Sequence, residues 1–291
     1  MKYLKNDLPD SSKKQPFFTI IIATLNVEDT VKECLDSIIQ QTEYNKIEIL
    51  IKDGGSTDET VNIIGNYKKH LSYFESSPDS SVYDAWNRLL PIASGKWVLF
   101  LGADDTLFDN SVISNSLAIL KMIDPSIELA YGKVRLVSKN NEPIIDIGKN
   151  LYKTRKCIKE KMCVPHQGIF HKRSLFIKSG YFNTEFSISS DYDFIRRVLH
   201  DSNVKYLDMI ISCMRTGGIS SDPKNTFIRL KEVRKINSKL GSKIPGPLWL
   251  ITFTNACFRQ SLIFLIGEKS GYYILDRFRT IAGLPAFWTK I

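Results

Sequence analysis

Short continuous apolar runs alternate with helix-like segments through the first third of the 291-residue chain. Residues 17–23, 47–51 and 96–101 read as strands, and the first of them is rich in isoleucine. A continuous apolar run of this length is typical of a strand that is buried on both faces. Segments with helical spacing of apolar residues, such as 31–39 and 81–92, lie between these strands. The pattern predicts an α/β fold with a mostly parallel central sheet flanked by helices.

The chain divides into three parts on composition. Residues 1–16 are polar and basic and lack the apolar stretch of a signal peptide, so we expect a flexible tail. Residues 17–220 contain the strand and helix alternation and its less regular continuation, and they form the predicted α/β domain. Residues 221–291 begin with a basic helix-like segment that Pro245 and Pro247 end. This last part is predicted to be a helical C-terminal extension.

Basic residues outnumber acidic ones, and the formal net charge is +9. Such a charge suits nucleic acid, an anionic membrane surface or a phosphate-bearing substrate. Nucleic acid is disfavoured, because the sequence shows no aromatic–basic stacking motif and no known nucleic-acid-binding domain. The five cysteines are an odd number and form no CxxC pair, so neither a zinc site nor a disulfide framework is expected. We therefore expect a reducing compartment.

A strongly apolar and aromatic segment covers residues 248–266. A membrane-spanning helix needs roughly 20 apolar residues, but Arg259 would lie near the middle of the bilayer here. An interfacial helix, or one packed on the protein, is therefore expected. Residues 243–291 carry a net charge of +4 and interleave cations with aromatic side chains, which suits the headgroup region of an anionic membrane. The alternative is packing on the chain itself or a homo-oligomer contact.

A glycine-containing turn follows the second predicted strand. It combines the carboxylate of Asp53 with Gly54 and Gly55, which permit a tight turn and a close approach of ligand to backbone. Ser56 and Glu59 have the spacing of a capping box, which predicts that Ser56 is the N-cap of the next helix. An exposed carboxylate at this place suits a base or a ribose. The alternative is a capped turn without a ligand.

Two adjacent acids, Asp104 and Asp105, follow the strand at 96–101. Neighbouring carboxylates at the end of a buried strand repel each other and lose solvation unless a cation or hydrogen-bond donors compensate. A hard divalent cation that also binds phosphate oxygens supplies this compensation. The pair therefore predicts a metal site, with a solvated turn as the alternative.

A third group of acids, Asp191 and Asp193, precedes an apolar helical stretch. Either carboxylate is placed to act as a general base at the N-terminus of a helix. The alternative is helix capping and a favourable interaction with the helix dipole, worth about 0.5–2 kcal/mol.

Taken in order, these motifs resemble glycosyltransferase family 2 of the bacterial cell-surface polysaccharide type, whose members have the GT-A fold. The resemblance covers residues 17–220 and includes Thr24-Leu25-Asn26 after the first strand. The segment 80–87 is similar to the family's D-x-G-[IV]-Y-D-A-x-N stretch, with Ser81 in the place of the usual glycine. His166-Gln167 resembles the family's H-Q pair, and residues 214–220 resemble a glycine-rich stretch near the site of bacterial relatives.

The resemblance implies a role for each matching residue. Asp53 would contact the nucleotide base, Asp104 would lie near the ribose or the sugar, and Asp105 would bind Mn²⁺ or Mg²⁺. Asp191 matches the position of the proposed catalytic base. The other donor-binding residues that the resemblance implies are Thr24, Asn26, Ser56, Asp79, Asn87, His166 and Arg215.

The implied activity is the inverting, metal-dependent transfer of a sugar from a nucleotide-diphosphate sugar to an acceptor hydroxyl. A UDP-sugar is the expected donor, and a glycan or a lipid-linked glycan is the expected acceptor. The metal would neutralise charge on the leaving diphosphate, and Asp191 would take the proton of the attacking hydroxyl. The expected location is cytoplasmic and peripheral on the inner face of the cell membrane.

Three other functions fit the sequence less well. A nucleotidyltransferase that makes a nucleotide sugar would share the sheet and the acids, but it would carry a glycine-rich basic loop where this chain has residues 24–28. A dinucleotide-binding oxidoreductase is weaker, because no GxGxxG follows an early strand. A non-catalytic, membrane-docked scaffold of the same fold is disfavoured by the presence of Asp53, Asp105 and Asp191.

Overall fold

A computed structural model describes residues 2–4, 15–148, 150, 155–199, 203–218 and 222–290. Several predicted features lie outside these ranges, namely most of the basic tail, including Lys5, Lys13 and Lys14, and Ile219-Ser220 of the glycine-rich stretch.

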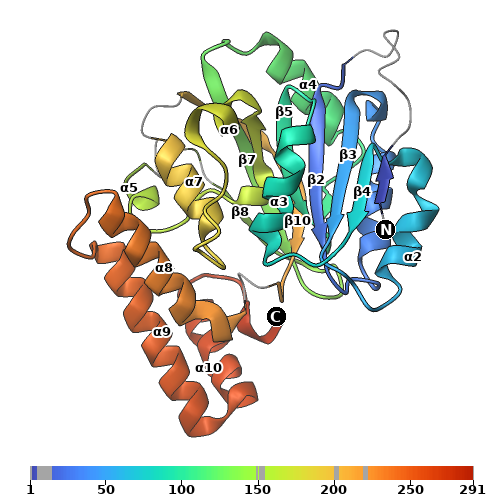
Figure 1. The fold of residues 1–291 in the computed structure, drawn as a ribbon. Helices are drawn as coiled ribbons and strands as arrows, with labels where there is room; N and C mark the ends of the chain where they lie inside the picture. Colours follow the sequence, from blue (N-terminus) through green and yellow to red (C-terminus); the bar gives the residue numbers. More distant parts are fainter. Residues whose placement is uncertain are drawn as a thin grey trace.

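One mixed sheet of ten strands forms the centre of the molecule (Figure 1). The strand order is β1-β4-β3-β2-β5-β9-β7-β10-β6, and β8 pairs with β7. The pairs β4–β3, β3–β2 and β2–β5 are parallel, as predicted for the first part of the chain. The pair β7–β10 is also parallel, and the remaining pairs are antiparallel. The strands are β1 (Lys2–Leu4), β2 (Phe18–Thr24), β3 (Ile47–Asp53), β4 (Tyr73–Ser76), β5 (Trp97–Gly102), β6 (Thr106–Leu107), β7 (Ile127–Val137), β8 (Pro143–Ile147), β9 (Ile169–Lys172) and β10 (Asn203–Arg215).

Helices cover both faces of this sheet, because successive side chains of a strand point to opposite sides. In β2, Ile20 and Ile22 pack in one core with Leu35, whereas Ile21 packs in the other core with Leu89. The first core contains residues of α1 (Val31–Ile39), α2 (Thr60–Asn66) and α4 (Val112–Met122). The second contains residues of α3 (Val82–Leu89), α5 (Arg155–Ile158), α6 (Ser174–Ser179) and α7 (Ser190–Val198). Burial on both faces explains the continuous apolar runs.

The helix after the glycine turn begins later than predicted. Its N-cap is Glu59, which makes no side-chain capping bond. The Ser56 hydroxyl instead donates to Asp53 Oδ1 at 2.5 Å. The predicted capping box is therefore wrong: the Ser56 oxygen accepts the Asn26 N–H at 2.8 Å instead of a backbone N–H of α2.

Part of the predicted N-terminal tail belongs to the sheet. Strand β1 pairs antiparallel with β4, with Lys2 opposite Glu75 and Leu4 opposite Tyr73. The prediction of a flexible tail over residues 1–16 is thus wrong for residues 2–4. Backbone pairing at a sheet edge requires little from side chains, which is why composition did not indicate it.

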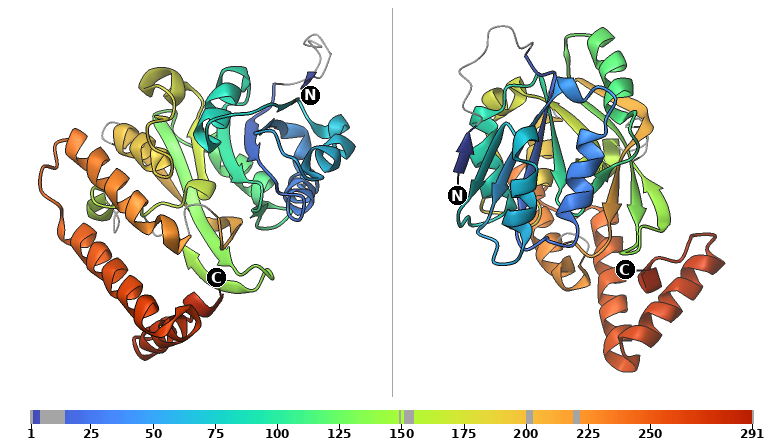
Figure 2. Two further views of the ribbon diagram at one scale, coloured as in Figure 1. Left: turned by 60° about the horizontal axis from the view of Figure 1, so that its bottom comes forward. Right: turned by 90° about the vertical axis from the view of Figure 1, so that its right-hand side faces the viewer.

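The C-terminal helices are α8 (Thr226–Lys239), α9 (Pro247–Ile266) and α10 (Glu268–Ile281), and they extend away from the sheet (Figures 1 and 2). Val233 and Ile236 of α8 are buried in the second core of the α/β domain. The predicted boundary at residue 220 therefore separates α8 from the core to which it belongs. Helix α9 reaches the edge of that core through Trp249, and no described residue of α10 belongs to it.

One face of α9 packs on the protein and the other is exposed. Arg259 is 8% exposed, donates to Thr226 Oγ1 at 2.6 Å, and lies 4.6 Å from the ring centroid of Trp288. Phe264 and Leu265 are 87% and 75% exposed. Among the described helices, α9 alone is long and apolar enough to cross a membrane, by length and composition. Its buried arginine makes one hydrogen bond and one cation–π contact within the protein, and its Nε has no hydrogen-bond partner among the described residues.

The structure joins Cys157 and Cys163 in a disulfide, with the two Cα atoms 6.3 Å apart. The expectation of no disulfide framework did not allow for this one pair. Counting cysteines did not reveal the pair, because a local turn between α5 and β9 brings them together. Cys34, Cys213 and Cys257 are free thiols.

Candidate active site

The sheet register places several predicted residues in one row. Thr24 pairs with Asp53, and Asp53 pairs with Ser76 on the next strand. Because β2, β3 and β4 are parallel, this row lies at their carboxyl ends, the edge where open α/β sheets bind ligands. Strand β5 runs parallel to β2 and ends at Gly102, so the acid pair comes to the same edge. The arrowheads of β2 and β3 mark this edge in Figure 1.

Asp53 is fully buried, and both carboxylate oxygens accept hydrogen bonds. Oδ1 accepts from the hydroxyls of Thr24 (2.9 Å) and Ser56 (2.5 Å). Oδ2 accepts from the Ser76 hydroxyl (2.7 Å) and from the backbone N–H groups of Gly55 (3.0 Å) and Ser56 (2.9 Å). Burial alone would raise the pKa of Asp53, but these donors outweigh it and lower the pKa. The carboxylate therefore organises the turn, and a base would have to displace one of its present partners.

Asn26 joins the loop after β2 to the loop after β3. Its backbone adopts φ 50°, a left-handed conformation that asparagine tolerates. Asn26 Oδ1 accepts from the Thr57 N–H at 2.9 Å, and the Asn26 N–H donates to Ser56 Oγ at 2.8 Å. The structure thus brings together four predicted donor-site residues, Thr24, Asn26, Asp53 and Ser56.

A buried lysine beside this group was missed by the sequence analysis. Lys52 is fully buried, and its Nζ donates to the carbonyls of Asp53 (2.7 Å) and Ser77. The same Nζ lies 3.8 Å from Asp79 Oδ2. Burial raises the pKa of Asp79, and the Lys52 charge counteracts this. The available signal was a lysine inside an otherwise apolar strand, next to the first acid.

The carboxylates of Asp104 and Asp105 converge over Gly102. A Cβ atom on Gly102 would lie 2.5 Å from Asp105 Oδ2 and 2.8 Å from Asp104 Oδ1. Gly102 is thus a further site residue, because only the absence of a side chain leaves room for both carboxylates. Asp105 is 2% exposed, and its Oδ1 accepts the Arg215 backbone N–H at 3.0 Å.

The electrostatics of the acid pair favour a cation. Burial raises the pKa of Asp105 well above its ordinary value, and the neighbouring Asp104 raises it further. Burial also raises the pKa of Asp104. No cluster of three or more His, Cys, Asp or Glu within the described ranges could hold a metal. Two carboxylates still fit Mg²⁺ or Mn²⁺ when substrate phosphates complete the ligand set, which is the usual arrangement for Mg²⁺.

Arg215 lies beside the acid pair, and one terminal nitrogen of its guanidinium is occupied while its buried Nε has no hydrogen-bond partner among the described residues. One terminal nitrogen is 2.7 Å from Glu33 Oε2 and 2.7 Å from Asn141 Oδ1. The positive charge lowers the pKa values of Asp104 and Asp105 in opposition to their burial. The predicted phosphate contact of Arg215 stays a prediction, whereas its backbone contact with Asp105 is a finding.

Asp191 lies in the first turn of α7. Its Oδ1 accepts the Tyr192 backbone N–H at 2.8 Å and the Tyr83 hydroxyl at 3.3 Å. Burial raises the pKa of Asp191 to about 6. Asp193, the other acid at this helix end, pairs with Arg197 at 2.9 Å. Asp191 is therefore the better candidate for a base.

Asn87 and His166 have structural contacts. The Asn87 amide donates to the Phe182 carbonyl at 2.8 Å and accepts the Phe182 N–H at 3.0 Å. His166 is 4% exposed and stacks on the rings of Trp86 and Phe100, each at 5.2 Å. Burial lowers the pKa of His166 well below its ordinary value, so the ring is neutral. Neither side chain offers a charge to the donor, so their predicted donor contacts rest on the resemblance alone.

The segment before α3 shows why Ser81 replaces the family's glycine. Ser81 has φ −177° and ψ 166°, an extended backbone that any residue adopts. Its hydroxyl accepts the Asp84 N–H at 3.2 Å, and Asp84 Oδ2 accepts the Ser80 N–H at 3.1 Å. The serine therefore serves as the N-cap of α3, and the backbone needs no glycine there.

Residues 19–175 match the profile described as "Glycosyl transferase family 2". The chain belongs to this family. A "PGL/p-HBAD biosynthesis glycosyltransferase" of Mycobacterium bovis (strain BCG / Pasteur 1173P2) is 33% identical over 239 residues, which are 79% of this chain and 88% of that protein. An uncharacterized glycosyltransferase of Mycobacterium tuberculosis (strain CDC 1551 / Oshkosh) is 27% identical over 77% of this chain and 85% of its own length.

Two solved structures share the fold of this glycosyltransferase. S. aureus TarS 1–349 in complex with UDP-GlcNAc has a TM-score of 0.60 at 19% identity, over 75% of this chain and 66% of that chain. The mannosyltransferase PcManGT from Pyrobaculum calidifontis, in complex with GDP-Man and Mn²⁺, has a TM-score of 0.60 at 16% identity, over 95% of this chain and 83% of that chain. These likenesses confirm the predicted GT-A fold.

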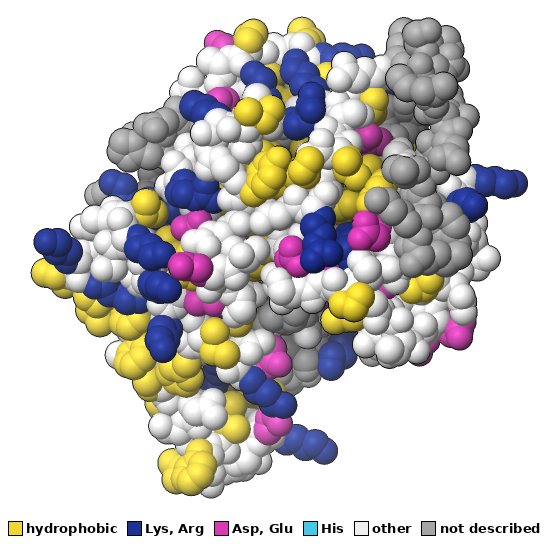
Figure 3. Space-filling model, in the orientation of Figure 1, with side chains coloured by type: hydrophobic (Ala, Val, Ile, Leu, Met, Phe, Trp, Pro, Cys, Tyr) yellow, Lys and Arg dark blue, Asp and Glu magenta, His cyan; other side chains and the backbone are white. Residues whose placement is uncertain are grey.

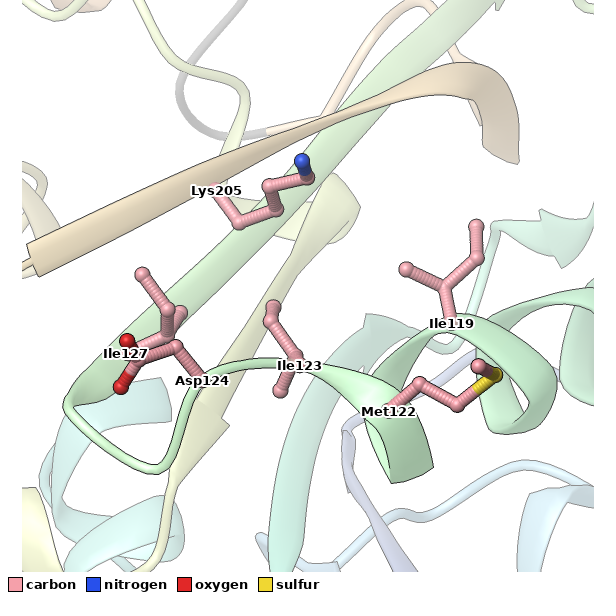
Figure 4. Close-up of a pocket in the computed structure, with 6 residues that line it drawn as sticks. All are labelled: Ile119, Met122, Ile123, Asp124, Ile127 and Lys205. Carbon is pink, nitrogen blue, oxygen red and sulfur yellow. The ribbon is translucent and has the colours of Figure 1, made fainter.

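A hollow of about 350 Å³ lies away from the site of this glycosyltransferase (Figure 4). It is lined by Ile119, Met122, Ile123, Asp124, Ile127 and Lys205. Ile127 begins β7 and Lys205 lies near the beginning of β10, so the hollow is at the amino ends of these parallel strands. The acids lie at the opposite edge, and the hollow is not part of the candidate site.

We predict that Gly102→Ala lowers the rate of transfer while the chain stays folded. The added Cβ would push apart the carboxylates of Asp104 and Asp105, so we expect activity to fall by at least about tenfold, a misplacement effect. Gly65→Ala is the matched control, because a Cβ there meets nothing within 4 Å. Released nucleotide diphosphate measures activity, and circular dichroism measures folding. Equal activity of the two variants would contradict the convergence of the acids.

The pKa of Asp191 predicts the pH dependence of turnover. A base must be ionised, so kcat should fall as the pH drops through about 6, where Asp191 becomes protonated. Asp191→Asn should lower kcat by about 10²–10⁴-fold, the usual contribution of a general base. Binding of the nucleotide should be unchanged. A variant with normal turnover would return Asp191 to a helix-capping role.

Proposed function

We propose that this glycosyltransferase moves a sugar from a nucleotide-diphosphate sugar to a hydroxyl of a glycan or lipid-linked glycan, with inversion and with a divalent cation. The observation that carries the proposal is the convergence of the Asp104 and Asp105 carboxylates over Gly102, at the edge that also holds Asp53. A UDP-sugar is the first candidate donor. TarS in complex with UDP-GlcNAc supports it, and the mannosyltransferase in complex with GDP-Man keeps a guanine nucleotide as the second candidate.

In the proposed complex, the loops after β2 and β3 bind the nucleoside. Gly54 lets a ligand approach the backbone, and Asp79 lies above it, 3.1 Å from where a Cβ would be. Asp104 and Asp105 would hold Mn²⁺ or Mg²⁺, which supplies charge neutralisation for the leaving diphosphate when bound. The Asp53 carboxylate keeps the loop in place through its hydrogen bonds, and Asn26 fixes this loop against its neighbour.

Asp191 is proposed to take the proton of the acceptor hydroxyl. Burial raises the pKa of Asp191 to about 6, close to the pH at which a base is most effective. The Tyr83 hydroxyl lies 3.3 Å from the Asp191 carboxylate and shares its single proton between this carboxylate and the Ile188 carbonyl. Burial keeps the pKa of Tyr83 well above its ordinary value, so this hydroxyl remains a donor at neutral pH. A single base at the acceptor hydroxyl suits a one-step displacement.

The acceptor is proposed to be membrane-held, and the enzyme peripheral on the cytoplasmic face of the membrane. Residues 221–291 contain twelve Lys and Arg against four Asp and Glu, and so carry +8 of the total +9. Large apolar side chains lie exposed beside these cations along α9 and α10 (Figure 3), among them Leu250, Ile251, Phe258, Phe264, Leu265 and Phe278. Exposed apolar area together with positive charge binds anionic leaflets. In a reducing compartment, Cys157 and Cys163 would be thiols.

The metal requirement is tested with a panel of nucleotide sugars. Transfer should cease in EDTA and return with Mn²⁺ or Mg²⁺, because the buried acids need a cation to accept a diphosphate. Asp105→Asn should abolish the activity, and added Mn²⁺ or Mg²⁺ should not restore it. Asp109→Asn is the control, an acid of the following loop whose carboxylate binds Ser111. Full activity in excess chelator would refute the metal assignment.

Membrane binding is tested by flotation with anionic vesicles. The full chain should float at low salt and less at high salt, because screening weakens the attraction of its cations. Replacing Phe264 and Leu265 by serine should reduce the bound fraction about tenfold or more, because each buried apolar side chain contributes about 1.5–3 kcal/mol. Met122→Ser is the control, an apolar residue 90% exposed on the sheet domain.

If the full chain does not bind anionic vesicles at low salt, the membrane proposal is wrong. Light scattering would then show whether the same apolar face joins two copies in a homo-oligomer.

A further inference from the structure

Helix α8 contributes a carboxylate to the segment that leads into the helix of the base. Glu232 Oε1 accepts from the Ser187 N–H (2.7 Å) and hydroxyl (3.0 Å). Glu232 Oε2 accepts from the N–H groups of Ile188 (3.1 Å) and Ser189 (2.8 Å). One side chain thus holds three successive backbone N–H groups, and Asp191 follows two residues later.

The same segment is held from the opposite side by α3. The Tyr83 hydroxyl donates to the Ile188 carbonyl at 2.6 Å, and it also reaches Asp191 Oδ1 at 3.3 Å. The peptide at Ile188 is therefore fixed at its N–H by Glu232 and at its carbonyl by Tyr83. Because Asp191 is three residues away in the first turn of α7, its direction depends on both contacts.

Helix α8 is itself rigidly placed, which a positioning contact requires. Val233 and Ile236, one and four residues after Glu232, pack in the second core and are 5% and 0% exposed. Asn237 Oδ1 accepts the buried Tyr192 hydroxyl at 2.9 Å, which ties α8 to α7 again one turn further along. The carboxylate of Glu232 therefore projects from a well-packed helix, α8, toward the backbone N–H groups of residues 187–189.

We propose that Glu232 is a positioning residue for the catalytic base: its hydrogen bonds to residues 187–189 hold the Asp191 carboxylate in the direction of the acceptor hydroxyl. The proposal rests on the proposed role of Asp191 as the base. It makes α8, which the sequence assigns to an appendage, a part of the active site.

The charge of Glu232 provides a readout that a purely structural contact would not give. The groups that face Asp191 are Tyr83 from α3, and Glu232 and Arg229 from α8. Burial raises the pKa of Asp191 first, the Tyr83 hydrogen bond lowers it, and the negative charge of Glu232 raises it. Removing that charge should therefore lower the pKa of Asp191 and move the acid limb of the kcat profile to lower pH.

The test compares the full-length wild type with Glu232→Gln, Glu232→Asp and Glu185→Gln. Glu232→Gln should lower kcat by about 10–100-fold, since small misplacements of a catalytic group have effects of this size. It should also move the acid limb to lower pH and leave the KM for the nucleotide sugar unchanged. Glu232→Asp keeps the charge but shortens the reach, so its kcat should fall while the acid limb stays in place.

Glu185→Gln is the matched control. Glu185 also joins the loop before α7 to α8, through Lys239 at 2.8 Å, but it is solvent-exposed and makes no contact with residues 187–189 among its described hydrogen bonds. Its kcat and its pH profile should match those of the wild type. Titration with UDP or GDP and circular dichroism verify that each variant is folded.

A Glu232→Gln enzyme with a wild-type kcat and acid limb would overturn the proposal. If Glu232→Gln does not fold, Glu232→Asp decides, and a normal kcat in that variant would overturn it equally. Asp191→Asn separates this failure from failure of the proposed function. An inactive Asp191→Asn with normal Glu232 variants refutes the positioning role alone, whereas an active Asp191→Asn refutes the base itself. In the Asp191→Asn background, Glu232→Gln should cause little further loss.

Discussion

The desolvated pair Asp104–Asp105 is the interaction on which the rest of the site depends. The two carboxylates follow the apolar strand β5, and their burial raises the pKa of each. Gly102 gives them room, and the Arg215 N–H, delivered by β10, satisfies one of their oxygens. The remaining charge is what the proposed cation and diphosphate would neutralise. The loops proposed to bind the nucleoside are held by Asp53, whose carboxylate has enough internal donors to stay ionised when buried.

The second half of the site is built by helices that are far apart in the sequence. Tyr83 on α3 and Glu232 on α8 hold the turn before α7, and Asp191 is placed by both. Helix α8 also connects to the basic and apolar pair α9–α10 through the Arg259–Thr226 hydrogen bond. The proposed membrane-binding face is thus joined, through α8, to the residue proposed to activate the acceptor.

Much of this arrangement could be predicted from the sequence. Buried parallel strands appear as unbroken apolar runs, and acids that directly follow such strands lie at the same edge of the sheet. Asp104 and Asp105 could be singled out for that reason, whereas Asp191 was indicated by its place before an apolar helical stretch. Glu232 could not, because its partners are 43 to 45 residues away and a glutamate on a basic helix looks solvated. His166 reads as a polar loop residue, yet its neighbours Trp86 and Phe100 come from other elements and bury it. The Asp53 hydrogen bonds depend on strand register, which the sequence pattern did not specify.

The most direct test of the account is a crystal structure of the chain with a UDP-sugar or its analogue and Mn²⁺, collected at a wavelength where manganese scatters anomalously. The account predicts one anomalous peak bound by the carboxylates of Asp104 and Asp105, next to the diphosphate, with the nucleoside along the loops after β2 and β3. A manganese peak away from these two acids, or a nucleotide bound in the hollow beside Met122 and Lys205, would contradict it.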